Sequence, residues 1–287
     1  MFCQLEVLRH CLAPSLRHQL NELPESLDET YARVLKEIES TSQGRHARRL
    51  LQCLAVAMRP LRVEELAEVL AFDLDAAEGE VPIFRPEWRC EDQEHVVLSA
   101  CSCLITIVKG DDSWVIQFSH FSVKEYLISD RLATASGCIS HYHIVPEPAH
   151  LILARACLGG LLTFNNRIHK ECDENSDEGG DKNSDEGMSL LKYAAEYWVS
   201  HAQVGNVSSR LKDTMETLFD SNKPYFLAWI RKYNICPHAR QRYVAVLKPK
   251  PLYYASLCGF HDLHQQNKSE IAALADKAIN CLHYTRL

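Results

Sequence analysis

A single histidine, His120, lies between a predicted strand and a predicted helix. Residues 104–108 and 114–118 are short runs rich in β-branched and aromatic side chains, and the turn-forming residues between them predict a β-hairpin. Ser122 and Glu125 have the S-x-x-E spacing of a capping box, which predicts a helix that begins at Ser122. Free N–H groups and the dipole at a helix N-terminus favour an anion. His120 is therefore a candidate anion-binding residue.

Patterns typical of enzymes are not found in the sequence. It has no G-x-x-x-x-G-K-[ST] phosphate loop, no G-x-G-x-x-G turn and no G-x-S-x-G nucleophile elbow. Gly159 and Gly160 lie within an apolar helical run, where we expect them to permit close packing. His141, His143 and His150 could ligate a metal, but no acidic or thiolate partner has a diagnostic spacing, so surface histidines are the preferred interpretation. We predict no catalytic residue and no metal site, and we expect that the chain is not an enzyme.

The negative charge of the chain is concentrated in one segment. The 287 residues carry a formal net charge of −7, and residues 171–187 hold eight acidic side chains and one basic one, which leaves 30 of each elsewhere. Asn-Ser-Asp-Glu-Gly occurs twice in this segment, at 175–179 and 183–187, a composition that predicts a disordered loop between helices. A calcium loop is the alternative, but its ligand spacing is absent. The balanced remainder offers no basic stripe for nucleic-acid phosphates.

Cysteine usage and hydropathy predict a cytoplasmic protein. The twelve cysteines form no paired C-x-x-C sets, and Glu6, Arg9 and His10 interrupt the first apolar stretch, so we expect no secretory leader. Reduced and mostly buried thiols are the favoured interpretation. The longest apolar run, residues 151–164, contains Arg155 and is too short to span a bilayer, so no membrane segment is predicted.

The order of the predicted elements indicates a mainly α fold. With 46% hydrophobic residues, the chain can bury a substantial core and has room for more than one domain. Residues 2–20 predict one or two helices interrupted by a proline, and a proline-containing acidic loop is expected at 73–91. Apolar periodicity predicts the following helices before and after the hairpin: 27–38, 47–58, 63–70, 92–103 and 122–127. Helix, helix, helix, hairpin is the order of a winged helix with a small β-hairpin wing. The later helices predict an α-helical domain after it: 149–164, 190–202, 211–219 and 224–233.

Two of these helices resemble a DNA-binding motif. They are joined by a tight turn at Arg59 and Pro60, and a helix-turn-helix could bind DNA through its second helix. That helix carries Glu64, Glu65 and Glu68 where a recognition helix would face phosphates. Glutamates there would repel the DNA backbone, so protein interaction or intramolecular packing is favoured. A winged-helix nucleic-acid-binding protein remains the alternative hypothesis.

Three segments together resemble one family. Residues 118–126, Phe-Ser-His-Phe-Ser-Val-Lys-Glu-Tyr, are similar to the F-x-H-x-[ST]-x-Q-E-[FY] signature in the winged-helix domain of NACHT-type STAND nucleotide switches, which include animal NOD-like receptors. Residues 23–31 and 59–67 look like the region after the NACHT ATPase core of fungal NACHT-ankyrin proteins, where the winged helix is of the GPI inositol-deacylase type. The resemblance extends, less specifically, through residues 193–201 and 251–261, and the latter are similar to an opening ankyrin helix.

The resemblance assigns a role to His120. In that family the winged-helix histidine contacts the β-phosphate of bound ADP and helps to hold the closed, inactive state, and His120 matches it by motif position. The alternative, favoured for this chain alone, is that His120 bonds a nearby carbonyl and stabilises the corner. The Walker A and Walker B segments of the family would lie before Met1, so we expect no cofactor and no ATP hydrolysis in this chain, whereas the intact family binds ADP or ATP.

The resemblance also implies a regulatory function. The chain is expected to be a non-catalytic part of a signal-transduction switch that couples nucleotide state to ankyrin-type sensor repeats. Its expected partners are a NACHT core, in cis or in trans, and ankyrin repeats, with no nucleic acid and no membrane. The expected domains are a helical segment at 1–42, the winged helix at 43–135, a helical domain at 136–262 that ends with the start of the ankyrin-like helix, and a divergent helix or tail at 263–287.

Overall fold

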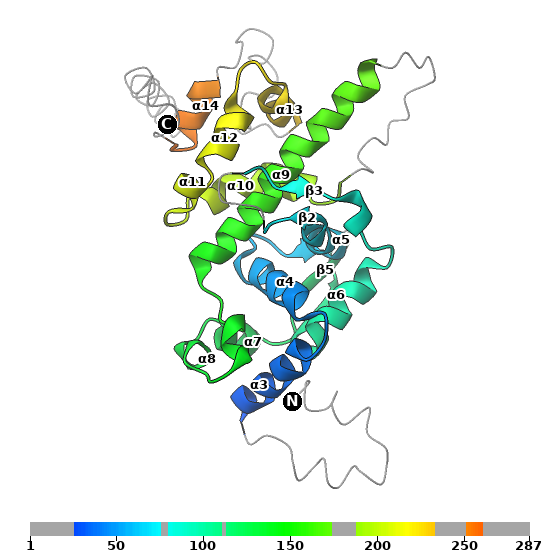
Figure 1. Cartoon of the computed structure of the whole chain (residues 1–287), viewed down its shortest axis with the longest axis vertical. Coiled ribbons are helices and arrows are strands. Elements are labelled where there is room, and N and C mark those ends of the chain that lie inside the picture. The colour runs from blue at the N-terminus through cyan, green and yellow to red at the C-terminus, as the bar shows by residue number, and fades with distance from the viewer. Residues whose placement is uncertain (1–25, 76–79, 111–112, 174–187, 233–250, 261–287) are drawn as a thin grey trace. The chain divides into compact units, whose positions relative to one another are not determined.

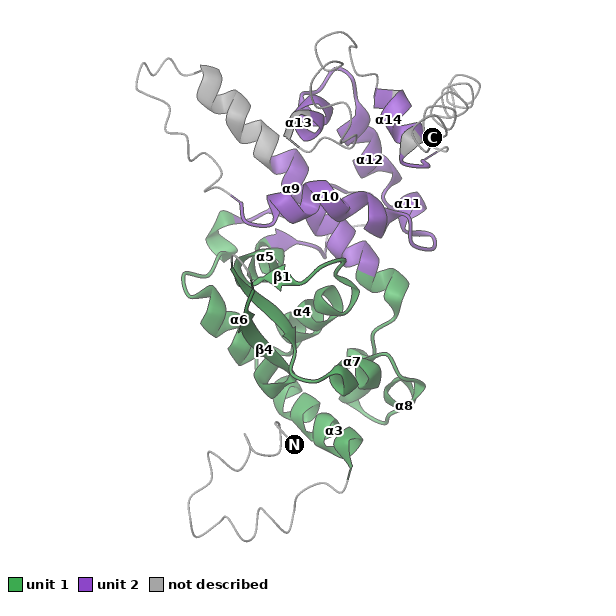
Figure 2. Ribbon diagram, turned by 180° about the vertical axis from the view of Figure 1, so that it is seen from behind, with its two compact units in different colours: residues 1–71, 86–149 green, residues 72–85, 150–287 purple. Residues whose placement is uncertain are grey.

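The computed structural model describes residues 26–75, 80–110, 113–173, 188–232 and 251–260. The chain divides into two compact units: unit 1 extends to Ala71 and includes Pro86–Ala149, and unit 2 comprises Phe72–Arg85 and the residues from His150 onward (Figure 2). The helices predicted at 2–20, the duplicated acidic sequence and the C-terminal helix predicted at 263–287 lie outside the described residues. The domain boundaries expected from the sequence stay predictions.

Unit 1 has the winged-helix order of elements that the sequence predicts (Figure 1). Its elements in chain order are α3 (Leu27–Glu39), α4 (Gly44–Val56), β1 (Leu61–Arg62), α5 (Val63–Glu68), η2 (Val69–Ala71), η3 (Pro86–Trp88), α6 (Gln93–Cys101), η4 (Ser102–Leu104), β4 (Ile105–Lys109), β5 (Trp114–Phe118), α7 (Phe121–Leu127), α8 (Asp130–Ala133) and η5 (Cys138–Tyr142). Helices α4, α5 and α6 pack on one another, and the hairpin β4–β5 follows them.

The sheet of unit 1 contains a strand that the sequence patterns do not reveal. β4 and β5 pair antiparallel, with Ile105 opposite Phe118, and β1 pairs with the other edge of β5, with Leu61 opposite Ile116. The strand order is therefore β1-β5-β4. A strand of two residues has no alternation of polar and apolar side chains, so only its pairing identifies it. The central strand ends two residues before His120, and the sheet thereby sets the start of the corner.

Helix α3 forms where apolar periodicity predicts a helix, and its N-terminus is capped. The Ser26 Oγ accepts the backbone N–H of Glu29 at 3.1 Å, which is the bond of an N-cap. Tyr31 and Leu35 are buried on the inner face of the helix, whereas Leu27 is 42% exposed and does not join the core. The predicted amphipathic helix is confirmed, with an apolar face that starts later than expected.

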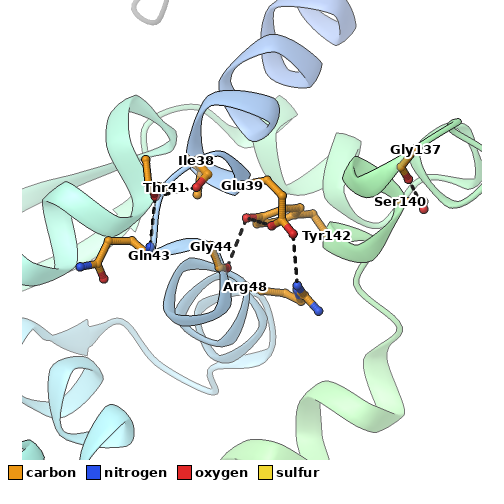
Figure 3. Close-up of polar contacts among 9 residues, drawn as sticks. All are labelled: Ile38, Glu39, Thr41, Gln43, Gly44, Arg48, Gly137, Ser140 and Tyr142. Atoms are coloured by element: carbon orange, nitrogen blue, oxygen red, sulfur yellow. Dashed lines mark hydrogen bonds and ion pairs between the residues drawn. The ribbon is translucent and has the colours of Figure 1, made fainter.

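The C-terminal end of α3 is held by a buried hydroxyl (Figure 3). Tyr142 Oη donates to Glu39 Oε2 at 2.8 Å and lies 3.2 Å from the carbonyl oxygen of Gly44. Arg48 lies 3.9 Å from the other carboxylate oxygen of Glu39. A Cβ atom at Gly44 would come within 2.7 Å of Glu39 Oε2, so the close approach of α3 and α4 favours glycine there. Burial and the bond to Glu39 raise the pKa of Tyr142.

Unit 2 is mainly helical, as predicted. Its elements are β2 (Phe72–Asp73), β3 (Ile83–Phe84), most of α9 (Pro146–Asp173), α10 (Leu191–Ala202), α11 (Val207–Arg210), α12 (Lys212–Phe219), α13 (Tyr225–Lys232) and α14 (Pro251–Leu257). Helix α13 and its neighbours enclose aromatic rings, among them Trp198 and Trp229 with centroids 5.3 Å apart. Helix α9 continues to Asp173, so the acidic segment predicted from residue 171 begins within a helix.

The loop predicted at 73–91 contains a short β-ribbon. β2 and β3 pair antiparallel, with Phe72 opposite Phe84 and their ring centroids 5.2 Å apart. The Phe72 ring packs on α9, where a Cβ atom at Gly159 would lie 3.2 Å from the ring and 3.0 Å from the carbonyl oxygen of Pro82. The close packing predicted for the glycine pair is confirmed. The expectation of a loop without regular structure at 73–91 is therefore corrected. The local sequence does not reveal the ribbon, because it packs on α9, a helix distant in sequence.

The bond at the end of α3 predicts a loss of stability when its donor is removed. Tyr142→Phe leaves the Glu39 carboxylate without its buried partner, and we expect the free energy of unfolding to fall by roughly 1.5–3 kcal/mol, the range for a hydrogen bond to a charged group. Urea denaturation followed by circular dichroism measures the change. A loss below about 0.5 kcal/mol, as for an ordinary surface substitution, would contradict the expected role of the hydroxyl.

Candidate functional site

The structure places His120 at the N-terminus of α7, where its side chain caps the helix. The residue has an extended backbone, with φ −153° and ψ 150°, and α7 begins at the next residue, Phe121. His120 Nδ1 accepts the backbone N–H of Ser122 at 3.3 Å and satisfies one of the free donors of the first turn. The capping box predicted at Ser122 and Glu125 is wrong, because Ser122 lies inside the helix and the histidine occupies the cap position.

A chain of hydrogen bonds joins this cap to helix α3. Ser122 Oγ lies 2.7 Å from His120 Nδ1 and 2.7 Å from Tyr31 Oη. Tyr31 is 4% exposed, and its ring packs on Tyr126 of α7 with centroids 5.6 Å apart. The imidazole is therefore held by its own helix and, through one hydroxyl, by a second helix.

The outer side of the imidazole remains accessible. His120 is exposed, and its Nε2 atom makes no hydrogen bond with any residue in the part of the chain that the structure describes. The neighbouring Phe121 ring has its centroid 4.2 Å from that of the imidazole and is 68% exposed. With Nδ1 occupied as an acceptor, the neutral ring carries its proton on Nε2. The corner thus presents one N–H donor beside one apolar ring.

Sequence reasoning located His120 but missed Tyr31. His120 and Ser122 belong to one short motif, whereas Tyr31 precedes Ser122 by 91 residues and fits the apolar face of α3. Nothing in that helical pattern signals a hydroxyl directed at the corner. The expected alternative, a bond from His120 to a carbonyl, is not seen among the described residues, where the ring bonds Ser122.

The glutamates of α5 are not arranged as the sequence suggests. Glu65 and Glu68 are 1% and 2% exposed. Two bonds of 2.6 and 2.8 Å join Glu65 to Arg59, and Glu68 pairs with Arg89. The expectation that three glutamates face outward is wrong for two of them, because a buried carboxylate requires a charged or hydrogen-bonding partner and finds one here. Glu64 is exposed. The absence of nucleic-acid binding stays a prediction.

Unit 2 contains a buried chain of polar side chains. The Nδ1 atoms of His150 and His201 are 2.7 Å apart, and His201 Nε2 lies 2.8 Å from Tyr193 Oη. His201 is fully buried, and this burial, together with the neighbouring His150, lowers the pKa of His201 to about 3. A hydrogen bond between two ring nitrogens needs one donor and one acceptor, so the contact requires at least one neutral ring.

The structure places the three histidines considered as metal ligands as follows. His141 and His143 belong to unit 1, and His150 belongs to unit 2, where it contacts His201. Among the described residues, no group of three His, Cys, Asp or Glu side chains could hold a metal ion. The absence of a metal site stays a prediction.

Several cysteines occupy the core as small apolar residues. Cys53, Cys101 and Cys258 are buried, and burial raises the pKa of each thiol to about 12. Since the thiolate is the reactive form, these side chains are unreactive near neutral pH. This agrees with the interpretation of the cysteines as buried thiols.

A comparison with protein families identifies the domain that carries the corner. Residues 35–138 match the family model described as "GPI inositol-deacylase, winged helix domain". This region is a winged helix of the GPI inositol-deacylase type. The winged-helix part of the resemblance is therefore confirmed. His120 and Ser122 lie within the matched region, and Tyr31 lies before it.

A curated fungal protein is similar to most of the chain. The "Azaphilone pigments biosynthesis cluster protein L" of Monascus ruber is 32% identical over 260 residues, which make up 84% of this chain and 50% of that protein. The chain thus spans about half the length of this curated relative. No solved structure matches the chain. Within the described ranges, no helix combines the length and the apolar character needed to cross a membrane.

The cap formed by His120 predicts that two substitutions at this position differ in stability. His120→Asn retains a side-chain acceptor, whereas His120→Leu removes it, and we expect the leucine variant to be less stable than the asparagine variant by roughly 1 kcal/mol. Urea denaturation compares the two, with His95→Leu on the exposed side of α6 as the control. Equal stability of the leucine and asparagine variants would contradict the cap.

The buried histidine chain predicts acid sensitivity of unit 2. The pKa of His201 in the folded protein, about 3, lies below the unfolded value of about 6.5, so the unfolded chain binds a proton that the folded chain does not. This contribution to stability is present above about pH 6.5 and is lost as the pH falls toward about 3, at about 1.4 kcal/mol per pH unit and proton.

Tryptophan fluorescence can follow this loss in unit 2. Trp198 and Trp229 are buried there, and Trp88 and Trp114 of unit 1 are replaced by phenylalanine to remove their signals. We expect His201→Gln to flatten the decrease of unfolding free energy between about pH 6.5 and pH 4, since one titrating group is removed. A profile as steep as that of the parent chain would show that His201 is not the acid-sensitive group.

Proposed function

We propose that this chain is a non-catalytic regulatory part of a NACHT-type STAND switch. The observation that supports this best is the geometry of the winged-helix corner. His120 uses Nδ1 to cap α7 and leaves the protonated Nε2 accessible beside the exposed Phe121 ring. A capped histidine has a fixed ring orientation, which suits the recognition of an anion that another domain presents.

In the proposed switch, His120 Nε2 donates a hydrogen bond to a phosphate oxygen of ADP that a separate NACHT core holds. The core supplies the remaining contacts with the nucleotide. A hydrogen bond to a charged group contributes roughly 1.5–3 kcal/mol, which corresponds to about a 10- to 100-fold slower release of ADP. Phe121 provides apolar surface at the same place for contact with the core. His120 would therefore stabilise the closed state only while ADP is bound.

The second part of the proposal is coupling to ankyrin-type repeats through unit 2. Helix α14 begins at Pro251, and Gly259 after it has a φ of 78°, which ends the helix in the left-handed conformation that glycine permits. Gln203 Nε2 donates to the carbonyl oxygen of Cys258 at 2.8 Å and ties this turn to the end of α10. The helix and its glycine turn are consistent with the ankyrin resemblance of this segment.

The proposal includes a cytoplasmic location and protein partners. These partners are a NACHT core, in cis or in trans, and ankyrin repeats. Nucleic acid and membrane have no role in it. The chain by itself would hydrolyse no ATP and would bind no ADP at micromolar concentration, because one histidine provides too few contacts to retain a nucleotide.

The proposal predicts that the chain slows the release of ADP from a NACHT core. Fluorescent mant-ADP is loaded on the NACHT core of a fungal homologue, and its dissociation is followed after addition of excess ADP, with and without the purified chain. We expect dissociation to be about tenfold slower or more with the chain, the effect of one charge-assisted hydrogen bond. Equal rates with and without the chain would contradict the proposal.

Substitutions of His120 separate the roles of its two nitrogens in the same assay. His120→Asn keeps the cap acceptor and lacks the Nε2–H donor, so we expect it to lose the slowing effect. His120→Gln places an amide N–H near the position of Nε2 and should retain part of the effect. His95→Asn is the matched exposed control and should act as the native chain does. An asparagine variant at position 120 that slows release fully would exclude Nε2 from the contact.

A further inference from the structure

We propose that Tyr31 is a positioning residue for His120. Through the Ser122 hydroxyl, Tyr31 fixes the imidazole tautomer that carries its proton on the accessible Nε2 atom. The importance of that proton rests on the proposed function, whereas the tautomer itself can be measured in the chain alone. Tyr31 lies before residues 35–138, so the matched winged-helix domain does not contain every residue that sets its corner.

The hydrogen bonds of the corner have one consistent direction. A backbone N–H can only donate, so His120 Nδ1 acts as the acceptor of the Ser122 N–H at 3.3 Å. Nδ1 then has no proton to offer, and the Ser122 hydroxyl 2.7 Å away must donate to it. The single hydroxyl proton of Ser122 is used in this bond. Tyr31 Oη, 2.7 Å from Ser122 Oγ, therefore donates to the serine oxygen.

This direction has a consequence for the imidazole. A proton on Nδ1 would face two donors, the N–H and the hydroxyl of Ser122, and would force the hydroxyl to turn away. Turning the hydroxyl would place its proton against that of Tyr31, which would have to turn as well. The tyrosine thus makes the alternative tautomer more costly than Ser122 would alone, because linked hydrogen bonds reinforce one another.

Helix α3 holds the tyrosine in place for this role. Tyr31 is buried, with its ring against Tyr126. Near the N-terminal end of α3, Asp28 pairs with Arg131 of α8, and at the C-terminal end Glu39 accepts the Tyr142 hydroxyl. Contacts at both ends restrict sliding of the helix. A displacement of α3 would withdraw the tyrosine hydroxyl and release the constraint on the tautomer.

The test is NMR spectroscopy of the whole chain with ¹⁵N-labelled histidine at alkaline pH. Long-range ¹H–¹⁵N correlations distinguish a protonated from an unprotonated ring nitrogen, and the loss of one signal set in His120→Asn identifies His120 among the 14 histidines. We expect the Nε2–H tautomer in the native chain. In Tyr31→Phe the ratio of Nε2–H to Nδ1–H should fall by roughly fivefold, the equivalent of about 1 kcal/mol for one hydrogen bond.

Three further variants make the result specific. Ser122→Ala removes the bridging hydroxyl and should lower the ratio at least as far as Tyr31→Phe does. Ser122→Thr keeps a hydroxyl and should retain the native ratio. If Ser122→Ala lowered the ratio only by disturbing the local structure, a threonine at this position would not be expected to preserve it. Tyr126→Phe removes a hydroxyl from the same aromatic pair and should leave the ratio unchanged. Backbone ¹H–¹⁵N spectra establish that each variant is folded.

The outcomes distinguish this inference from the proposed function. A native tautomer ratio in folded Tyr31→Phe overturns the role of Tyr31, even when Ser122→Ala shifts the ratio. If the ratio shifts but the native chain has no effect on mant-ADP release, the positioning role holds and the proposed function fails. If both hold, Tyr31→Phe should speed the release of mant-ADP by a similar factor of roughly five.

Discussion

The geometry of the site depends on how the first turn of α7 satisfies its backbone N–H groups. Only Ser119 and His120 separate the central strand of the sheet from the helix, so a side chain at this corner is the nearest acceptor. His120 does so with Nδ1. This one bond sets the orientation of the ring, assigns the proton to the opposite nitrogen, and leaves Nε2 as the atom that can meet a partner. The structural and the proposed functional roles of His120 therefore use different atoms and do not compete.

Helix α3 is the second element that the corner needs. An ion pair at the surface holds its N-terminal end, the buried Tyr142 hydroxyl holds its C-terminal end, and between them Tyr31 reaches Ser122. The whole helix belongs to unit 1, but the family match begins at residue 35 and therefore includes only the C-terminal part of α3. A fragment that begins at residue 35 would therefore lack the hydroxyl that orients Ser122. The helix gives a physical route by which the segment before the domain can act on its exposed histidine.

Regular sequence patterns predicted most of the fold. The features that they did not predict form through contacts between residues that are distant in sequence. The helical periodicity of α3 and α4 and the β-branched runs of the hairpin are local signals, and the structure confirms them. The strand β1 and the ribbon β2–β3 are too short to have a period and exist through their partners. The buried Glu65 and Glu68 were assigned to the surface because charge alone does not reveal the arginine partners. At the site, the motif located His120, but the helix cap and the contact with Tyr31 become apparent only in the folded structure.

In the proposed switch, Nε2 of His120 contacts a nucleotide phosphate while Nδ1 continues to cap α7. A crystal structure of the chain bound to an ADP-loaded NACHT core would show whether both contacts form together. We expect His120 Nε2 to lie within about 3 Å of a phosphate oxygen, with Nδ1 still accepting the Ser122 N–H. A phosphate met by Nδ1, or a complex in which the winged-helix corner faces away from the nucleotide, would contradict this expectation.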